Sequence, residues 1–341
     1  MHVLVTGAGG FIGSHVAEAL LASGHRVTGV DAFVPYYPRA LKERNLEAAL
    51  ADPAYRFVEL DLRTDPLAEL FEEPLDAVVN EAAMPGLMMS WSDFDGYVSC
   101  NLLLVQRLLE ACRENGVTRL LHASTSSVYG AEAVGDEDAP TRPVSPYGVT
   151  KLAAEYLIRA YAASFDIEAV ILRYFSIYGP RQRPDMAFNR FIVAMAAGEP
   201  ITVHGDGTQS RSSTYVGDCV RATVDALATA PSGEAYNIGG GEVVSVLDAI
   251  GILADVLGVT PDVRFEATRQ GDQRHTRADV RKAEAAFGYR PSTSFAEGLR
   301  RQAEWQLGGR PPRRGGSPRA PSRGSRGRPR RRARRRRRWP G

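Results

Sequence analysis

The sequence predicts an α/β protein whose main domain is a doubly wound parallel sheet, followed by a smaller α/β lobe. Three observations support this prediction. A glycine-rich turn separates the first apolar run from the first helical stretch. Apolar runs and helical stretches then alternate over residues 1–175, as in a parallel sheet covered by helices on both faces. Acidic, small or hydroxyl residues follow several of these runs, where ligands bind in such sheets.

The first 31 residues alternate strand, glycine turn, helix and strand. Residues 3–5 and 26–30 are apolar runs typical of buried strands, and residues 14–22 have helical spacing. Glycines in the turn allow the backbone to approach a diphosphate closely, and the N-terminus of the helix attracts its negative charge. We therefore expect a dinucleotide site. Its predicted turn residues are Gly7, Gly10, Phe11, Ile12 and Gly13.

Asp31 ends the second predicted strand. An acid at this place accepts hydrogen bonds from the hydroxyl groups of an adenine ribose and repels a 2′-phosphate, which favours NAD over NADP. A glycine pattern alone is also compatible with an ordinary strand–helix turn. The flanking strands and the spacing of Asp31 favour the dinucleotide site.

The rest of the main domain continues the alternation. Strands are predicted at residues 56–60, 75–79, 119–123 and 169–174, and helices at residues 40–51, 97–115 and 147–164. Because the carboxyl ends of parallel strands meet at one edge, the residues that follow them should share a crevice. These residues are Asp61 and Leu62, Ala82 and Ala83, Thr125, and Ser176.

Residues 176–307 have a looser texture and form the predicted smaller lobe. Helices are expected at residues 187–197, 218–229, 245–257, 279–287 and 295–307, and strands at residues 201–203, 236–238 and 263–265. The expected division is a main domain over residues 1–175, with parts of 212–241 interleaved, and a substrate lobe over residues 176–307.

The charge is distributed unevenly along the chain. The formal net charge is +2, but residues 308–341 contain fifteen arginines and no acid, which leaves residues 1–307 with a net charge of −13. The main body therefore offers no general basic surface for nucleic acid. The tail has almost nothing to bury and is expected to be disordered. It is interpreted as a solvated tail without a role, or as a C-terminus read in the wrong frame, in preference to a segment that binds polyanions.

Three cysteines without a C-x-x-C pair, Cys100, Cys112 and Cys219, indicate reduced thiols and a cytoplasmic protein. The histidines show no metal-binding spacing, so no metal site is expected. No apolar run has the length of a membrane helix, and the first strand begins too early for a signal peptide.

A second motif carries the predicted chemistry. Tyr147 and Lys151 lie four residues apart and so share one face of a helix. A tyrosine has a pKa near 10, and a lysine ammonium beside an oxidised nicotinamide lowers that pKa enough for the phenolate to act as a base. Thr125 lies 22 residues before Tyr147 and is expected to hydrogen-bond the same substrate hydroxyl. By itself this spacing is also compatible with two exposed helix residues.

Four motifs together carry a family resemblance: Gly7-x-x-Gly10-x-x-Gly13, the runs at residues 124–130 and 173–180, and the segment from Tyr147 to Lys151. Over residues 1–307 the chain resembles the extended short-chain dehydrogenases/reductases, in their nucleotide-sugar epimerase/dehydratase branch. The resemblance implies a Rossmann-like fold, a tightly bound and recycled NAD, and a UDP-sugar substrate.

The resemblance also implies roles for residues that spacing alone does not identify. Cofactor contacts are implied for Asp61, Leu62, Ala82, Ala83, Asn101, Tyr147, Lys151 and Tyr174. Substrate contacts are implied for Ser126, Ser127, Ser176, Arg183, Asn189, Arg190, Val203, Arg211, Asp272 and Arg274. Arg211 and Arg274 match arginines that clamp the diphosphate, because a guanidinium fork suits phosphate oxygens. For each arginine a surface ion pair is the alternative.

Three positions distinguish members of the branch. Dehydratases of this kind carry Asp-Glu where this chain has Ser126 and Ser127, and UDP-glucuronate decarboxylases carry Glu at the place of Ser127. Galactose-type 4-epimerases usually carry Asn at the place of Ser176. The remaining pattern resembles the UDP-glucuronate 4-epimerases.

Oxidation of glucuronate at C4 gives a β-keto acid that loses CO₂ easily, so an epimerase must grip the carboxylate. Ser126, Ser127, Ser176 and Arg190 are expected to do so. Relatives often carry an arginine within the segment that corresponds to residues 85–91, and this chain does not. The run Arg211-Ser212-Ser213-Thr214-Tyr215 also departs from the usual R-D-F-T-Y. A related sugar nucleotide therefore stays open as the substrate.

The predicted function is NAD-dependent inversion of C4 of UDP-glucuronate through a transient 4-keto sugar. The alternatives are a decarboxylase or other 4-keto-forming oxidoreductase, a UDP-glucose 4-epimerase, and a non-catalytic NAD-binding protein with a nucleic-acid-binding tail. The resemblance further implies a homodimer built through helices 97–115 and 147–164.

Overall fold

A computed structural model describes residues 1–267 and 275–308 of the chain. The arginine-rich tail from residue 309 onward lies outside the described residues. The same is true of Asp272 and Arg274, the predicted contacts to ribose and diphosphate.

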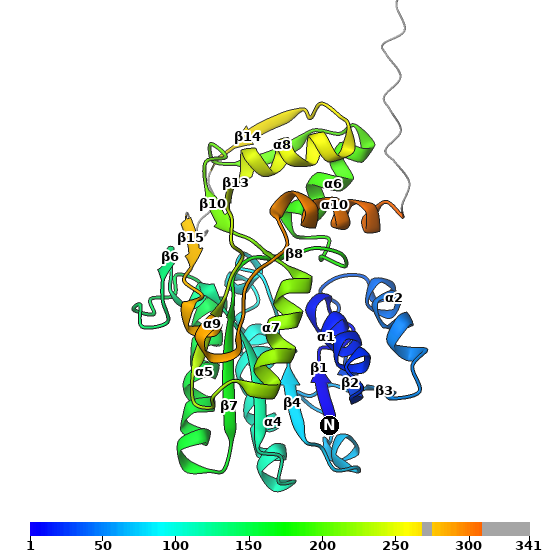
Figure 1. Cartoon of the computed structure of the whole chain (residues 1–341), viewed down its shortest axis with the longest axis vertical. Coiled ribbons are helices and arrows are strands. Elements are labelled where there is room, and N and C mark those ends of the chain that lie inside the picture. The colour runs from blue at the N-terminus through cyan, green and yellow to red at the C-terminus, as the bar shows by residue number, and fades with distance from the viewer. Residues whose placement is uncertain (268–274, 309–341) are drawn as a thin grey trace, which may run out of the picture.

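The main sheet confirms the predicted fold class (Figure 1). Within the described residues, seven parallel strands form it in the order β12-β7-β5-β4-β1-β2-β3. The order reverses at β1, which pairs with β2 on one side and β4 on the other. The strands are β1 (His2–Thr6), β2 (Arg26–Asp31), β3 (Tyr55–Glu59), β4 (Ala77–Asn80), β5 (Arg119–Thr125), β7 (Glu168–Tyr174) and β12 (Ala235–Ile238).

Two apolar cores cover the two faces of this sheet. One holds Val3 and Val5 of β1 together with Val16 and Leu20 of α1 and residues of α7. The other holds Leu4 of β1 with residues of α4 and α5. Alternate strand residues point to opposite faces, so β1 contributes to both cores. The helices are α1 (Phe11–Ala22), α2 (Arg39–Leu50), α4 (Leu104–Glu114), α5 (Pro146–Ser164), α7 (Val216–Thr229) and α9 (Arg281–Phe287).

The helix predicted at residues 97–115 is interrupted. It begins earlier, as α3 (Phe94–Val98), passes through one π-helical stretch, η3 (Ser99–Leu103), and continues as α4. The π-helical stretch contains the buried Asn101, whose amide bonds both the backbone N–H and the backbone C=O of Met84. This local change of helical pitch places Asn101 against the loop after β4. The periodicity of the sequence does not show it.

A small lobe lies beyond one end of the sheet, with α6, α8 and α10 beside a short parallel strand pair (Figure 1). Its core includes Val203, Leu253 and Phe295. Its elements are α6 (Ala187–Ala197), β9 (Ile201–His204), α8 (Val246–Leu257), β14 (Val263–Glu266) and α10 (Phe295–Gln306). The strand predicted at residues 236–238 does not pair in this lobe: as β12 it pairs with β7 in the main sheet.

Short strands link the two parts. They had no clear sequence pattern because each spans only two to four residues. They form one sheet, β13-β10-β15-β6, and one pair, β11-β8. Their bounds are β6 (Glu132–Gly135), β8 (Ile177–Tyr178), β10 (Ser210–Ser212), β11 (Thr214–Tyr215), β13 (Val243–Ser245) and β15 (His275–Ala278).

Candidate active site

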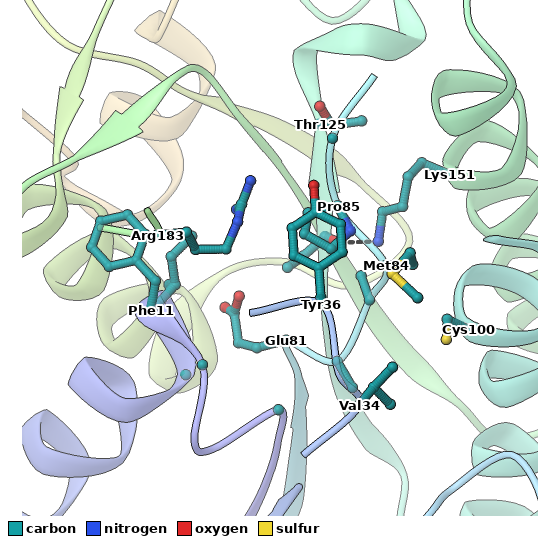
Figure 2. A pocket seen from close by; sticks show the side chains of 18 of the residues that line it. Phe11, Val34, Tyr36, Glu81, Met84, Pro85, Cys100, Thr125, Lys151 and Arg183 are labelled. Atoms are coloured by element: carbon teal, nitrogen blue, oxygen red, sulfur yellow. Dashed lines mark hydrogen bonds between the residues drawn. The ribbon is translucent and has the colours of Figure 1, made fainter. Parts of the chain in front are cut away.

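A cavity of about 410 Å³ lies at the carboxyl ends of the main strands and collects most of the predicted site residues (Figure 2). The residues that line it include Gly7, Gly10, Phe11, Ile12, Gly13, Asp31, Asp61, Leu62, Ala82, Ala83, Thr125, Ser126, Ser127, Tyr147, Lys151, Tyr174, Ser176, Arg183 and Arg211. Cavities of this size hold small ligands in proteins. The crevice expected from the strand ends therefore exists, whereas the role of each residue stays a prediction.

The glycine turn forms a cradle that side chains would fill. Gly7 has a φ of +67°, and a Cβ atom there would lie 2.9 Å from the backbone nitrogen of Ala82. A Cβ on Gly10 would lie 2.9 Å from the carbonyl oxygen of Gly7. Helix α1 begins directly after Gly10 without a side-chain cap, so its first N–H groups face the cavity unblocked by a side chain. These features suit a diphosphate and hence the predicted NAD.

Two carboxylates lie at the end of the cavity predicted for adenosine. Asp31 accepts hydrogen bonds from the backbone N–H groups of Gly9, at 3.1 Å, and Phe33, at 2.7 Å. The ammonium of Lys42 lies 3.5 Å from it. Lys42 also lines the cavity. The sequence did not predict this, because Lys42 belongs to no motif and the periodicity of a helix does not show which loop a side chain reaches.

Asp61 is paired with Arg63, which sequence reasoning also missed. The Nη2 atom of Arg63 lies 2.7 Å from a carboxylate oxygen of Asp61, and this hydrogen-bonded pair holds the pKa of Asp61 below its usual range. Both residues line the cavity, so this end presents a neutralised ion pair.

Helix α5 positions Tyr147 and Lys151. Its N-cap, Ser145, accepts a hydrogen bond from the backbone N–H of Gly148, which fixes the start of the helix one residue before Tyr147 is reached. Burial raises the pKa of Tyr147, while Thr125 and the positive charge of Arg183 oppose that rise. The threonine and the arginine therefore both favour the ionised form of the predicted base.

Lys151 makes its hydrogen bonds to residues of β5. Its ammonium donates to the carbonyl oxygen of Ala123 at 2.5 Å and lies 3.2 Å from Nε2 of His122. Burial lowers the pKa of Lys151 to about 8, and the charges of Glu81 and Glu155 limit that fall. Burial and the positive charge of Lys151 also lower the pKa of His122 well below 6.5, which keeps its ring neutral beside the ammonium.

Glu81 is a further cavity residue that sequence reasoning passed over. It follows β4 directly, where the sequence predicts site residues only at Ala82 and Ala83. Burial raises the pKa of this carboxyl group to about 7. The sequence does contain a signal for Glu81, because it is the one acid in a segment of apolar and small residues that follows the strand.

Hydroxyl groups and a cation surround the cavity near Tyr147. Ser176 has a left-handed backbone, with φ of +44°, and its carbonyl oxygen accepts from the N–H of Thr214. This conformation is strained for a residue with a side chain. The guanidinium of Arg183 points into the same cavity (Figure 2), and it pairs with the carboxylate of Asp185 at 3.0 Å. The site can therefore receive a polar or anionic group beside the tyrosine.

Four predicted residues do not line the cavity. Asn101 uses its amide on Met84 and Thr150, and Val203 is packed in the core of the small lobe. Asn189 donates to the backbone oxygen of Gln182, and Arg190 is exposed on α6. Their contacts with cofactor or substrate stay predictions.

Comparison with known proteins identifies the family. Residues 3–239 match the model of the NAD dependent epimerase/dehydratase family. The chain belongs to this family. The predicted family and its NAD dependence are thereby confirmed.

Individual relatives are more specific. A UDP-glucuronate 4-epimerase of Thermodesulfobacterium geofontis is 36% identical over 89% of this chain and 95% of that protein. A Bacillus subtilis protein described as an uncharacterized UDP-glucose epimerase, YtcB, is 44% identical over 88% of this chain and 96% of that one. The crystal structure of UDP-glucuronic acid 4-epimerase from Bacillus cereus, in complex with UDP-glucuronic acid and NAD, has a TM-score of 0.87 at 43% identity and covers 90% of this chain and 99% of that chain.

Two further observations concern the described residues alone. No helix within residues 1–267 and 275–308 has the length and apolar character needed to cross a membrane. Across those same residues, no group of three or more histidine, cysteine or acidic side chains could hold a metal ion.

Proposed function

We propose that this protein is an NAD-dependent 4-epimerase that interconverts UDP-glucuronate and UDP-galacturonate. The observation that carries the proposal is the presence of Tyr147, Lys151 and Arg183 in the cavity that the glycine turn lines. The first two suit oxidation at a sugar hydroxyl, and the third supplies a cation for a carboxylate. The named functions of the T. geofontis and B. cereus relatives support the same assignment.

Tyr147 acts as the general base and then as the general acid. It accepts the proton of the C4 hydroxyl and returns it to the same oxygen after the ketosugar has turned its other face. Thr125 orients the hydroxyl, and Lys151 contributes a positive charge that favours the phenolate. Bound NAD supplies the acceptor and donor of the C4 hydride.

The carboxylate of glucuronate must be held while C4 is a ketone. Loss of CO₂ requires the C–C bond to the carboxylate carbon to align with the π system of the ketone. A rigid grip that holds the carboxylate out of this alignment therefore suppresses decarboxylation. Ser127, Ser176 and Arg183 offer two hydroxyl groups and a guanidinium for this grip. Arg183 thus supplies the cation that the segment 85–91 lacks.

Product analysis tests the proposal. The purified protein, incubated with UDP-glucuronate, should form UDP-galacturonate and reach the same mixture from either side. Release of CO₂ with pentose products would make it a decarboxylase. Absence of turnover with UDP-glucuronate would refute the substrate.

UDP-glucose epimerisation is the second candidate. It is favoured by the apolar segment with Leu87, Met88 and Met89, where relatives often carry a cation, and by the name of the B. subtilis relative. Competition between UDP-glucose and UDP-glucuronate in one reaction separates the two. Preferential conversion of UDP-glucose would favour the second candidate.

We further propose a cytoplasmic homodimer. The three cysteines are free and buried, in keeping with a reducing compartment. Apolar side chains are exposed on neighbouring helices, with Leu103 on η3 and Val149 and Tyr156 on α5.

Removal of the tail after Leu307 tests the non-catalytic alternative. Unchanged sugar turnover together with lost polyanion binding would show that the tail acts separately from the enzyme.

A further inference from the structure

Glu81 has no part in the reaction described above, yet it lines the cavity. The segment that contains it crosses the glycine turn, since a Cβ on Gly7 would lie 3.1 Å from the backbone carbon of Glu81. Figure 2 shows its carboxyl group pointing into the cavity that Lys151 enters from α5. Ionisation of a carboxyl group in this place would change the net charge of the cavity.

Glu81 begins a row of three short oxygen–oxygen contacts that leads away from the cavity into α7. The hydroxyl oxygen of Tyr174 lies 2.7 Å from Oε1 of Glu81 and 2.8 Å from Oγ1 of Thr223. That Oγ1 lies 2.9 Å from the carbonyl oxygen of Cys219. Each contact needs one proton to be a hydrogen bond, and the two hydroxyl groups supply two. The third proton can come from the carboxyl group of Glu81.

The row therefore has two arrangements of protons. With Glu81 neutral, its O–H donates to Tyr174, Tyr174 donates to Thr223, and Thr223 donates to the carbonyl oxygen of Cys219. With Glu81 ionised, Tyr174 donates to the carboxylate and Thr223 donates to Tyr174, so the contact with the carbonyl oxygen loses its hydrogen bond. Ionisation thus costs one hydrogen bond in addition to the burial of a charge.

The charged and titratable groups that face Glu81 come from three elements. Lys151 on α5 favours the carboxylate, and the hydrogen bond from Tyr174 on β7 acts in the same direction. The thiol of Cys219 on α7 interacts with the hydroxyl groups of Tyr174 and Thr223, and burial keeps it protonated by raising its pKa. Burial of the carboxyl group outweighs these effects and brings its pKa to about 7. Glu81 is therefore poised to change its charge near neutral pH.

We propose that Glu81 is a proton-coupled charge switch for the bound cofactor, ionised beside oxidised NAD and protonated beside the reduced form. The proposal rests on the NAD site of the proposed function. A positive ring in the same cavity favours the carboxylate, and loss of that charge favours the acid. By reciprocity, a rise in pH that ionises Glu81 must stabilise the oxidised cofactor relative to the reduced one.

The holoenzyme can be tested without any sugar nucleotide. Wild-type protein and the Glu81→Gln variant are equilibrated with a redox dye couple between about pH 6 and 8, and the bound NADH is read from its absorbance. Glutamine can donate to Tyr174 as the neutral acid does, but it cannot ionise. The ratio of NADH to NAD⁺ in wild-type protein should fall with pH by up to about tenfold more per pH unit than in the variant. Equal slopes would overturn the proposal.

Thr223→Val is the matched variant that keeps Glu81. Without the threonine hydroxyl, Glu81 is the one hydrogen-bond partner that Tyr174 keeps in this row, so the pKa of Glu81 should fall. The pH range in which the ratio of NADH to NAD⁺ falls most steeply should therefore move to lower pH. An unchanged position of the steep region would contradict the proton count.

Infrared difference spectra of the wild-type holoenzyme provide a readout that needs no variant. Reduction near neutral pH should add the C=O band of a protonated carboxyl group, and absence of that band would overturn the proposal. Failure of the sugar assay would not change these results, whereas equal slopes in an active epimerase would refute the switch alone.

Discussion

Tyr147 and Lys151 enter the cavity from consecutive turns of α5, and burial shifts the pKa of each side chain so that its neutral form is favoured. It raises the pKa of the phenol and lowers that of the ammonium to about 8. The protein alone therefore keeps Tyr147 protonated near neutral pH. Its use as a base requires the additional positive charge that oxidised nicotinamide brings.

Tyr147→Phe tests this role. The variant should keep its fold and its bound NAD, because the hydroxyl is the sole group removed. Turnover should fall by roughly 10²–10⁴-fold, the usual contribution of a general acid–base. Tyr156→Phe is the control, since Tyr156 lies on the same helix and is 63% exposed. Near-normal turnover of the Tyr147 variant would refute the assignment.

Arg183 and Arg190 are alternative cations for the carboxylate, and the structure separates them. Arg183 lines the cavity, whereas Arg190 is exposed on α6. Arg183→Gln should reduce kcat/KM for UDP-glucuronate by about tenfold to a hundredfold, the worth of a charge-assisted hydrogen bond, and should spare UDP-glucose. Arg190→Gln should leave both unchanged. The reverse pattern would return the carboxylate contact to Arg190.

At the scale of the element, the turn between β1 and α1 depends on Gly7. Gly7→Ala would place a Cβ in a left-handed conformation and 2.9 Å from the nitrogen of Ala82. The variant should lose stability and purify with little NAD. Gly24→Ala is the control: Gly24 has a φ of +79° but no atom within 4 Å of a new Cβ, so it should lose about 1 kcal/mol and keep its NAD. Calorimetry and cofactor content distinguish the two.

Another element-scale prediction concerns the contact of α1 with the loop after β8. His15 lies 3.0 Å from the carbonyl oxygen of Pro180, and burial together with Arg181 lowers its pKa from 6.5 to about 4. Between these values the unfolded chain binds the proton and the folded chain does not, so stability should fall as pH falls from about 6.5 to about 4.

His15→Gln should remove this contribution, which is at most about 3 kcal/mol, and flatten the pH dependence of unfolding. His275→Gln, at an exposed position, is the matched control and should keep the wild-type slope. Parallel curves for wild-type protein and the His15 variant would contradict the explanation.

Sequence reasoning was most successful where the period of the pattern is regular. Strands β1 and β2 and helix α6 lie within one or two residues of their predicted bounds, because each buries a continuous or periodic apolar face. It missed the π-helical stretch at Ser99–Leu103 and the linking strands, since neither changes the apolar period enough to be seen.

The site was predictable in part for a similar reason. Gly7, Asp31 and Tyr147 follow strand ends or form fixed motifs, and topology brings such positions together. Glu81 and His122 were missed because their importance comes from partners far away in the sequence. Glu81 meets Tyr174 across 93 positions, and no local pattern records that contact.

For the whole molecule, the exposed apolar side chains on α3, η3 and α5 are the feature that a single chain leaves unexplained. Phe94 is 48% exposed, Leu103 is 53% exposed and Tyr156 is 63% exposed. Val149 and Tyr156 are seven residues apart and so lie on one face of α5. Burial of this surface against a second copy would remove apolar area from water at about 25 cal/mol per Å².

Light scattering during gel filtration should therefore give the mass of a dimer for the wild-type chain. The Leu103→Arg/Tyr156→Arg double variant should give a monomer, because two guanidinium groups would have to be buried in the interface. Glu114→Arg, a charge change at the far end of α4, is the control and should stay dimeric. Monomeric wild-type protein, or a double variant that remains dimeric, would show that these helices do not form the subunit contact.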